Sequence, residues 1–133
     1  MAAIRKSIDL ILQNSTNELL TIESFNLIRG EWGPAGPPVR GDVIPKQGSK
    51  RWMSLSKAFT GVDGYLHLGS TKGYIKITWH VPLSGMQNLA VDVTVPDRLA
   101  SLAPCYNTEL ADYPVVLVTL VPSLVGSPPD RGE

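Results

Sequence analysis

The chain has 133 residues, and its 12 lysines and arginines balance 12 aspartates and glutamates, so the formal net charge is +0 at pH 7. This length suits one domain with one core. The charge balance lacks the basic surplus with which nucleic-acid binders hold phosphates, so we expect no nucleic-acid partner. With 43% hydrophobic and 18% charged residues, the composition excludes a disordered chain, and its apolar runs are too interrupted for a membrane-spanning helix.

The single cysteine, Cys105, excludes an internal disulfide and a multi-cysteine zinc site, and we expect no cofactor or metal. At the N-terminus, Arg5 and Lys6 precede the apolar stretch Ser7–Leu12, which Asp9 interrupts. That stretch is far shorter than the hydrophobic region of a secretory signal, so we expect no signal peptide. The protein would then stay in the cytoplasm until lysis or an unconventional route releases it.

The first predicted strand is Ser7–Asn14, in which apolar and polar residues alternate. Its apolar face carries Ile8, Leu10 and Leu12, and the face expected to be exposed to solvent carries Ser7, Asp9 and Gln13. A second apolar run, residues 19–32, changes phase near Glu23 and Ser24, which indicates a β-bulge or a change of sheet. Residues 33–38 read Gly-Pro-Ala-Gly-Pro-Pro and predict an exposed loop with Trp32 at its mouth.

Further strands are predicted at residues 51–59, 65–68, 74–81, 89–95 and 115–121. In the first of these, Met53 and Leu55 are expected to face the core, and Ser54 and Ser56 to face solvent. The last one is apolar on both sides, which is typical of a strand covered on both faces. Between them, residues 97–103 favour a single helical turn.

These patterns predict an all-β fold, an antiparallel β-sandwich of about eight strands, although periodicity alone does not separate a sandwich from a barrel. The domain is expected to occupy residues 1–121. Residues 122–133 contain glycines and prolines and little to bury, and they predict a flexible C-terminal tail.

The sequence shows no convincing grouping of a nucleophile with a base or of clustered carboxylates, so we expect no enzymatic activity. His67 and His80 lie on the polar faces of separate predicted strands. A dyad of either histidine with Cys105 is an alternative, but a lone loop cysteine is more often structural. The sequence Gly61-Val62-Asp63-Gly64 lies between two strands with no helix after it to bind an anion, so it predicts a turn and not a phosphate site.

Three large rings are placed where they could meet a ligand: Trp32 beside the Gly/Pro loop, and Trp52 and Tyr65 on the polar parity of their strands. The alternative is that these rings belong to the core, as the phase of Trp79 predicts for that residue. Several cations surround Trp52 in the sequence and could hold lipid phosphate, although a solvated charged face is the alternative. They are Lys46, Lys50, Arg51 and Lys57.

Several segments together resemble the aegerolysin family. They are a first strand ending in Asn14-Ser15, a strand closing in Trp32-Gly33, the Gly61–Gly64 sequence, and the stretch Trp-His-Val-Pro-Leu-Ser-Gly-Met-Gln-Asn at residues 79–88. The most specific residues are Trp79, Pro82 and Asn88, and the order and spacing match over most of residues 7–121.

This resemblance implies a small β-sandwich without enzymatic activity that binds particular membrane lipids, often sphingolipids. It also implies a larger perforin-like partner that forms the pore, the two proteins making a cytolytic or insecticidal pair that acts outside the cell at a target membrane. By position, Trp32 matches the tryptophan that the family uses near the lipid headgroup, and residues 60–64 match a loop that helps to choose the lipid.

The chain also departs from the family. Leu83 and Met86 stand where fungal members carry a second tryptophan and a lysine, Val81 replaces a cysteine, and the Gly/Pro loop replaces an acidic one, which argues against sphingomyelin-type specificity. The candidate lipid-binding residues are Trp32, Arg51, Trp52, Asp63, Tyr65, Leu83 and Met86.

Two alternatives stay open at this point. An actinoporin-like protein has a similar sandwich and inserts an N-terminal helix by itself, but residues 1–6 are too few for such a helix. A carbohydrate-binding module or lectin would instead stack Trp32, Trp52 and Tyr65 on sugar faces.

Overall fold

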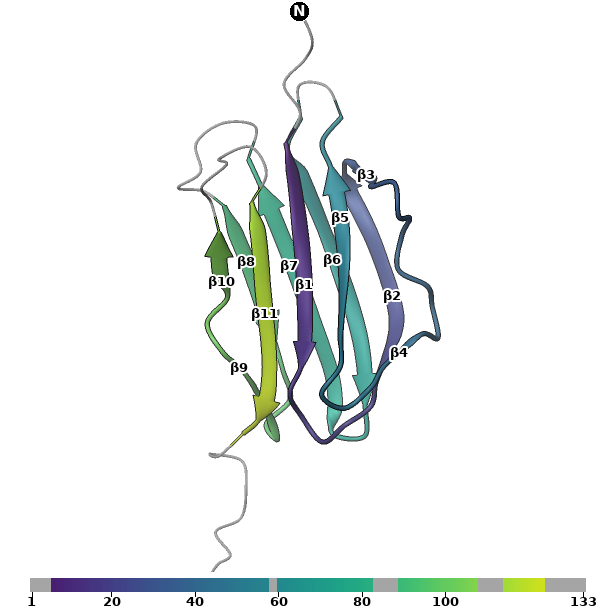
Figure 1. Cartoon of the computed structure of the whole chain (residues 1–133), viewed down its shortest axis with the longest axis vertical. Coiled ribbons are helices and arrows are strands. Elements are labelled where there is room, and N and C mark those ends of the chain that lie inside the picture. Colours follow the sequence, from purple (N-terminus) through teal and green to yellow (C-terminus); the bar gives the residue numbers. More distant parts are fainter. Residues whose placement is uncertain (1–5, 58–59, 83–88, 108–113, 124–133) are drawn as a thin grey trace, which may run out of the picture.

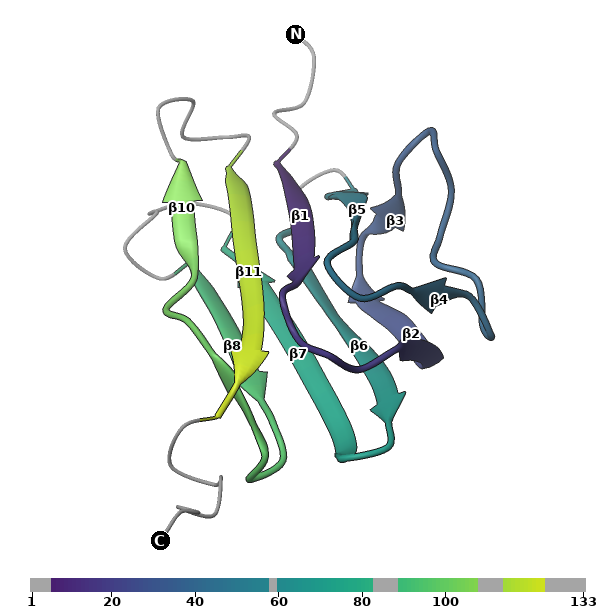
Figure 2. The same ribbon diagram turned by 60° about the horizontal axis from the view of Figure 1, so that its bottom comes forward.

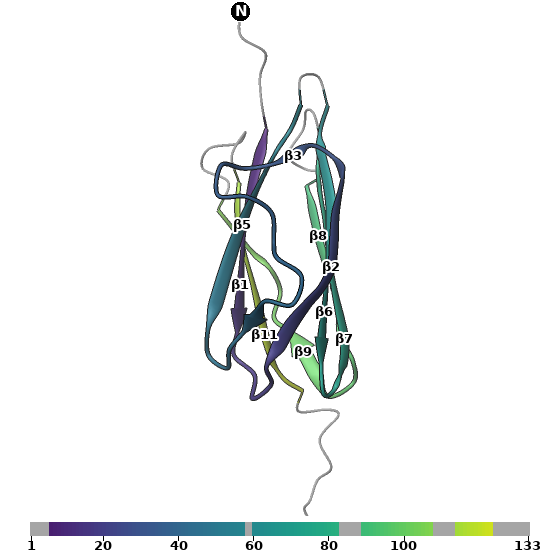
Figure 3. The same cartoon turned by 90° about the vertical axis from the view of Figure 1, so that its right-hand side faces the viewer.

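In the computed structural model the chain forms two β-sheets packed face to face (Figure 1). The structure describes residues 6–57, 60–82, 89–107 and 114–123. These ranges contain eleven strands and no helix, so none of their segments is a helix that could cross a membrane. Figure 3 shows the two layers edge-on, and the segment between β3 and β4 runs along the open side of the sandwich.

The six-stranded sheet has the order β10-β11-β1-β5-β3, and β9 also pairs with β11. Its strands are β1 (Ser7–Asn14), β3 (Glu31–Trp32), β5 (Ser49–Leu55), β9 (Leu99–Ser101), β10 (Cys105–Asn107) and β11 (Val115–Pro122). All pairs are antiparallel except β1 with β11, which run parallel in the middle of the sheet (Figure 2).

The five-stranded sheet has the order β4-β2-β6-β7-β8 and is antiparallel throughout. Its strands are β2 (Leu20–Arg29), β4 (Val43–Ile44), β6 (Val62–Ser70), β7 (Gly73–Val81) and β8 (Ala90–Thr94). The expected antiparallel β-sandwich is therefore confirmed, with one parallel pair and with four short strands, β3, β4, β9 and β10, that the periodicity did not show.

The core lies between the two sheets and follows the predicted alternation in β1, β7 and β8. Its buried apolar side chains include Ile8, Leu10 and Leu12 of β1, Leu66 and Leu68 of β6, Ile75, Ile77 and Trp79 of β7, and Val116, Val118 and Leu120 of β11. Trp79 is 4% exposed, so the prediction that it belongs to the core is confirmed.

The phase change near Glu23 in the second apolar run comes from a β-bulge, the first of the two predicted causes, and the chain changes sheet only later, at Gly30. The register of β2 against β6 shifts between Ile22 and Ser24, which is a bulge at Glu23. The chain then leaves the five-stranded sheet at Gly30, and β3 joins the edge of the other sheet beside β5. Gly30 has a φ of 111°, and a Cβ there would lie 2.6 Å from the carbonyl oxygen of Leu55.

Two predictions about the last third of the chain are wrong. The expected helical turn at residues 97–103 contains strand β9 instead, because Ala100 and Ser101 pair with the end of β11. Strand β11 is covered on one face only, since Leu117 on its other face is 37% exposed. Beyond β11, the N–H of Ser123 donates to the carbonyl of Arg98 at 3.1 Å, and residues 124–133 of the expected tail lie outside the described residues.

Two predictions about polar faces are also wrong. Ser7 and Asp9, expected to face solvent, are 5% and 7% exposed, and Arg51 of the neighbouring strand pairs with Asp9. Ser54 and Ser56 are buried, because the alternation of β5 runs in the opposite sense to the predicted one. The hydroxyl of Ser56 accepts a hydrogen bond from the N–H of Lys6 at 2.8 Å, which satisfies a buried polar group.

Candidate functional site

One end of the sandwich collects several of the candidate residues. There β2 and β7 finish, β6 begins and β3 crosses to the other sheet, and we call it the Trp32 end. The register of the three longer strands places Arg29, Asp63 and His80 side by side on the outer face of the five-stranded sheet. This alignment depends on contacts between distant strands, because the register of β2 against β6 shifts twice, at Glu23 and again between Leu27 and Arg29, before Arg29 meets Asp63.

Asp63 is the centre of this row. The Nε of Arg29 lies 3.2 Å from one carboxylate oxygen, and the Nδ1–H of His80 donates to the other. The Arg29 and His80 side chains are 60% and 47% exposed, whereas that of Asp63 is 20% exposed. The row therefore offers a solvent-facing cation and an imidazole, both held in place by one carboxylate.

Trp32 lies behind this row, between the sheets. Its ring makes edge-to-face contacts with Phe25 at 5.9 Å and with Trp79 at 6.2 Å between centroids. The ring is half-buried and packs against the core, so it closes the open edge where the chain changes sheet. Trp32 thus combines a packing role with partial exposure at this end.

Gly64 makes room for this aromatic cluster. A Cβ at Gly64 would lie 2.7 Å from Cζ2 of Trp79 and 2.6 Å from Cδ2 of Leu27. Among the described residues, the buried indole N–H of Trp79 has no hydrogen-bond acceptor, so the indole packs as an apolar ring. The expectation of a turn at residues 61–64 is wrong, because residues 62–64 belong to β6, where Gly64 faces the core.

Tyr65 lies on the same outer face as Asp63, two residues further along β6. Its ring is half-buried: the Nζ of Lys76 lies 5.6 Å from the ring centroid, and His67 makes an edge contact at 6.0 Å. Tyr65 and both histidines therefore line the outer face of the five-stranded sheet, as the polar parity predicted. Cys105 lies in the other sheet, so the described structure brings neither histidine to it.

Trp52 and Arg51 lie on opposite faces of β5, so they do not form a joint lipid-binding surface at the Trp32 end. Strand alternation sends Trp52 inward, where it packs against the core, and Arg51 outward on the six-stranded sheet. The Nε of Arg51 donates to Asp9 at 3.2 Å, and this hydrogen bond, together with the charge of Asp9, raises the pKa of Arg51. The core interpretation of Trp52 is therefore the one that the structure supports.

The cations near Trp52 in the sequence do not form one cluster. Lys50 lies 3.6 Å from the carboxylate of Asp42, whereas Lys46 and Lys57 lie beyond opposite ends of β5. The remaining two candidates, Leu83 and Met86, lie outside the described residues. No group of three or more His, Cys, Asp or Glu residues that could hold a metal ion occurs within the described ranges.

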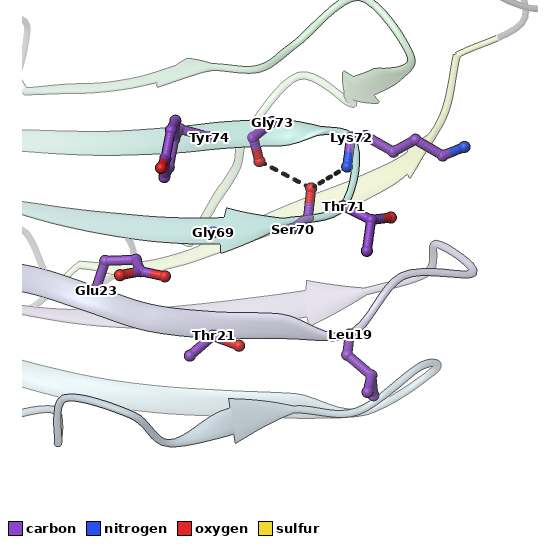
Figure 4. A pocket seen from close by; sticks show the side chains of 9 residues that line it. All are labelled: Leu19, Thr21, Glu23, Gly69, Ser70, Thr71, Lys72, Gly73 and Tyr74. Atoms are coloured by element: carbon purple, nitrogen blue, oxygen red, sulfur yellow. Dashed lines mark hydrogen bonds between the residues drawn. The ribbon is translucent and has the colours of Figure 1, made fainter.

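A groove that the sequence analysis missed lies at the opposite end, beside the turn between β6 and β7 (Figure 4). Its volume is about 640 Å³, and its lining includes Leu19, Thr21, Glu23, Gly69, Lys72 and Tyr74. Two signals in the sequence point to it: the bulge at Glu23, and the aromatic residue Tyr74 on the polar parity of β7. Only the pairing of β2, β6 and β7 brings these residues together.

The fold has counterparts among solved structures. The chain superposes on IP-1A from Alcaligenes faecalis with a TM-score of 0.67, at 15% identity, covering 92% of this chain and 95% of that one. The fold is aegerolysin-like. The chain also superposes on the lipid-binding protein Nakanori with a TM-score of 0.68, at 14% sequence identity, and the match covers 86% of this chain and 70% of Nakanori.

Sequence comparison adds nothing to these matches: no protein-family model and no curated protein sequence matches the chain. The aegerolysin-like fold predicted from scattered sequence segments is therefore confirmed at the level of structure. At this identity the likeness concerns the arrangement of the strands, and the chemistry of the Trp32 end depends on this chain's own residues.

Proposed function

We propose that this protein binds membrane lipids and does so through the Trp32 end. The observation that carries the proposal is the fold shared with Nakanori, which is described as a lipid-binding protein, over 86% of this chain. The sandwich is a rigid scaffold, and its strand ends present side chains at the edge that can approach a membrane.

The Trp32 end has the residue types that a membrane interface favours. The half-buried ring of Trp32 can place its exposed part among the headgroups, where aromatic rings with a polar tip are enriched. Each Å² of apolar surface removed from water contributes roughly 25 cal/mol. Arg29, 60% exposed and fixed by Asp63, adds about 1 kcal/mol near an anionic surface. Contributions of this size give reversible docking.

The finer part of the proposal is that the protein is the recognition half of a two-component cytolytic or insecticidal toxin. After release from the cell, it would dock on a target membrane and recruit a larger perforin-like protein that forms the pore. The resemblance of the sequence to aegerolysins supports this division of labour. The self-sufficient actinoporin-like mechanism is the alternative, and leakage measurements distinguish the two.

The experiment is co-sedimentation of the protein with vesicles of phosphatidylcholine alone, or with phosphatidylserine, sphingomyelin and cholesterol, or ceramide phosphoethanolamine, alongside dye release from the same vesicles. We expect binding to at least one mixture and no leakage. Binding to none of the mixtures would refute the lipid proposal. Leakage caused by the protein alone would refute the two-component proposal and favour the actinoporin-like one.

Matched variants locate the binding surface. Arg29→Ala should weaken binding to phosphatidylserine-containing vesicles about fivefold, which corresponds to about 1 kcal/mol. Lys50→Ala is the control, because Lys50 is also a cation in a surface ion pair but lies in the six-stranded sheet, where it pairs with Asp42. Equal losses in both variants would mean that the Trp32 end is not the docking surface.

A further inference from the structure

The groove beside the β6–β7 turn has a glycine at its floor, a carboxylate on one side and an aromatic ring on the other. Gly69 forms the floor, and its register partner on β7 is Tyr74. Glu23 rises from β2 on the other side of Gly69, and Figure 4 shows its carboxylate and the Tyr74 ring flanking the same stretch of β6. The volume of about 640 Å³ lies in the range of small-molecule sites.

The bulge in β2 positions Glu23. Ile22 pairs with Leu68 and Ser24 with His67, so Glu23 has no register partner on β6. Its carboxylate instead lies over Gly69, where a Cβ would be 2.5 Å from Oε2. A bulge re-aims a side chain in this way next to binding sites. Within the described residues, no donor pairs with this carboxylate, so its oxygens are available to a ligand.

Tyr74 is the most exposed large hydrophobic residue in the described part of the chain, at 73%. Tyr65 on the same face is covered by Lys76, but no cation or ring contact covers Tyr74 among the described residues. A ligand in this groove can therefore stack on the Tyr74 ring and donate hydrogen bonds to the Glu23 carboxylate at the same time. The two groups are complementary to a ligand with an apolar C–H face and hydroxyl groups at its rim.

We propose that this groove binds a neutral saccharide unit, with one sugar face stacked on Tyr74 and hydroxyl groups donating to Glu23. A phosphate over the floor would face the Glu23 carboxylate, while the ammonium of Lys72 points away from the floor (Figure 4). A quaternary ammonium is typically held by several rings, whereas among the described residues Tyr74 is the one aromatic side chain that lines the groove. A neutral sugar needs neither a cation over the floor nor a second ring, so it is compatible with both observations.

This site is separate from the Trp32 end, because β6 runs from one to the other: Asp63 stands at its start and Gly69 near its finish. The residues also differ from Trp32, Trp52 and Tyr65, on which the sequence suggested sugar stacking. Saccharide binding and vesicle binding therefore succeed or fail independently, since neither proposal uses a residue of the other.

The test uses the full chain on an array of immobilised neutral oligosaccharides containing glucose, galactose, mannose and N-acetylhexosamines, followed by calorimetry with the best free oligosaccharide. We expect Tyr74→Ala and Glu23→Gln each to raise the Kd at least tenfold. Tyr74→Phe, which keeps the ring, should stay within threefold of the original protein. Thermal melting of each variant confirms that it is folded, as expected for exposed side chains.

Tyr106→Ala is the matched control, because Tyr106 is an exposed tyrosine, at 41%, in the other sheet. It should bind as the original protein does. The proposal is overturned if no oligosaccharide on the array binds, or if Tyr74→Ala binds as tightly as Tyr106→Ala. Displacement of the bound sugar by millimolar phosphocholine or ethanolamine would also overturn it in favour of a lipid headgroup.

Discussion

At the scale of single residues, Asn14 shows why the first strand ends where it does. Its side chain is fully buried, and its Nδ2 donates to the carbonyls of Glu18 at 2.8 Å, Pro45 at 3.0 Å and Ile44 at 3.2 Å. Its Oδ1 accepts from the N–H of Thr16 at 3.1 Å. One amide therefore satisfies backbone groups of the turn after β1 and of β4, which belongs to the other sheet.

Asn14→Ala should lower the free energy of unfolding by about 3 kcal/mol, because it leaves several buried backbone groups without partners. Asn26→Ala is the control: Asn26 is exposed on the outer face of β2, and we expect a change below about 0.5 kcal/mol. Urea denaturation followed by tryptophan fluorescence measures both. Similar midpoints for the two variants would contradict the role given to Asn14.

At the scale of elements, the crossing from β2 to β3 joins the two sheets and positions Trp32. Gly30 permits it with a φ of 111° and by its close approach to the backbone of Leu55. An L-residue is strained at such a φ, and a Cβ would also collide with a carbonyl oxygen that belongs to the sheet. The element therefore depends on glycine for two separate reasons.

A substitution at Gly36 separates the effect of the positive φ from the effect of the steric collision. Gly36 has a φ of 93°, but a Cβ there would meet nothing within 4 Å. We expect Gly36→Ala to lower stability by about 1 kcal/mol and Gly30→Ala by at least about 2 kcal/mol, the difference being the collision with Leu55. Thermal denaturation by circular dichroism compares the two variants, and an equal loss would show that backbone conformation alone matters.

At the scale of the whole molecule, the sandwich is completed by its last strand. β11 lies parallel to β1 in the centre of the six-stranded sheet, with Asp9 opposite Val115 and Asn14 opposite Leu120. It contributes Val116, Val118 and Leu120 to the core. β11 follows all the other described strands in the sequence, yet it is needed to bury one side of β1, the first of them.

Two truncations test this closure. A chain ending after Ser123 keeps β11 and the bond from Ser123 to Arg98, and it should melt within about 2 °C of the full chain. A chain ending after Pro114 lacks β11, exposes one side of β1 and should show no cooperative melting transition. If the shorter chain melted cooperatively, β11 would be an accessory strand. A large loss in the longer one would show that residues 124–133 stabilise the domain.

Much of this architecture follows from local patterns in the sequence. Alternation located β1, β2, β7 and β8, the bulge at Glu23 and the burial of Trp79, because the side-chain period of a strand is a property of a few consecutive residues. The segments that resemble aegerolysins indicated the fold, since they occur in the same order and spacing. The phase of β5 was misjudged because both of its faces carry apolar residues: Trp52 shares one face with Ser54, and Met53 and Leu55 lie on the other.

The tertiary structure decided what depends on pairing between distant strands. It set β1 parallel to β11, placed Trp52 against the core and Arg51 on Asp9, and aligned Arg29, Asp63 and His80 in one row. It also brought Glu23 and Tyr74 together across Gly69. Register between strands is fixed by the sum of their contacts, so the sequence by itself determined the longer strands, and only their assembly determined the short edge strands and the sites.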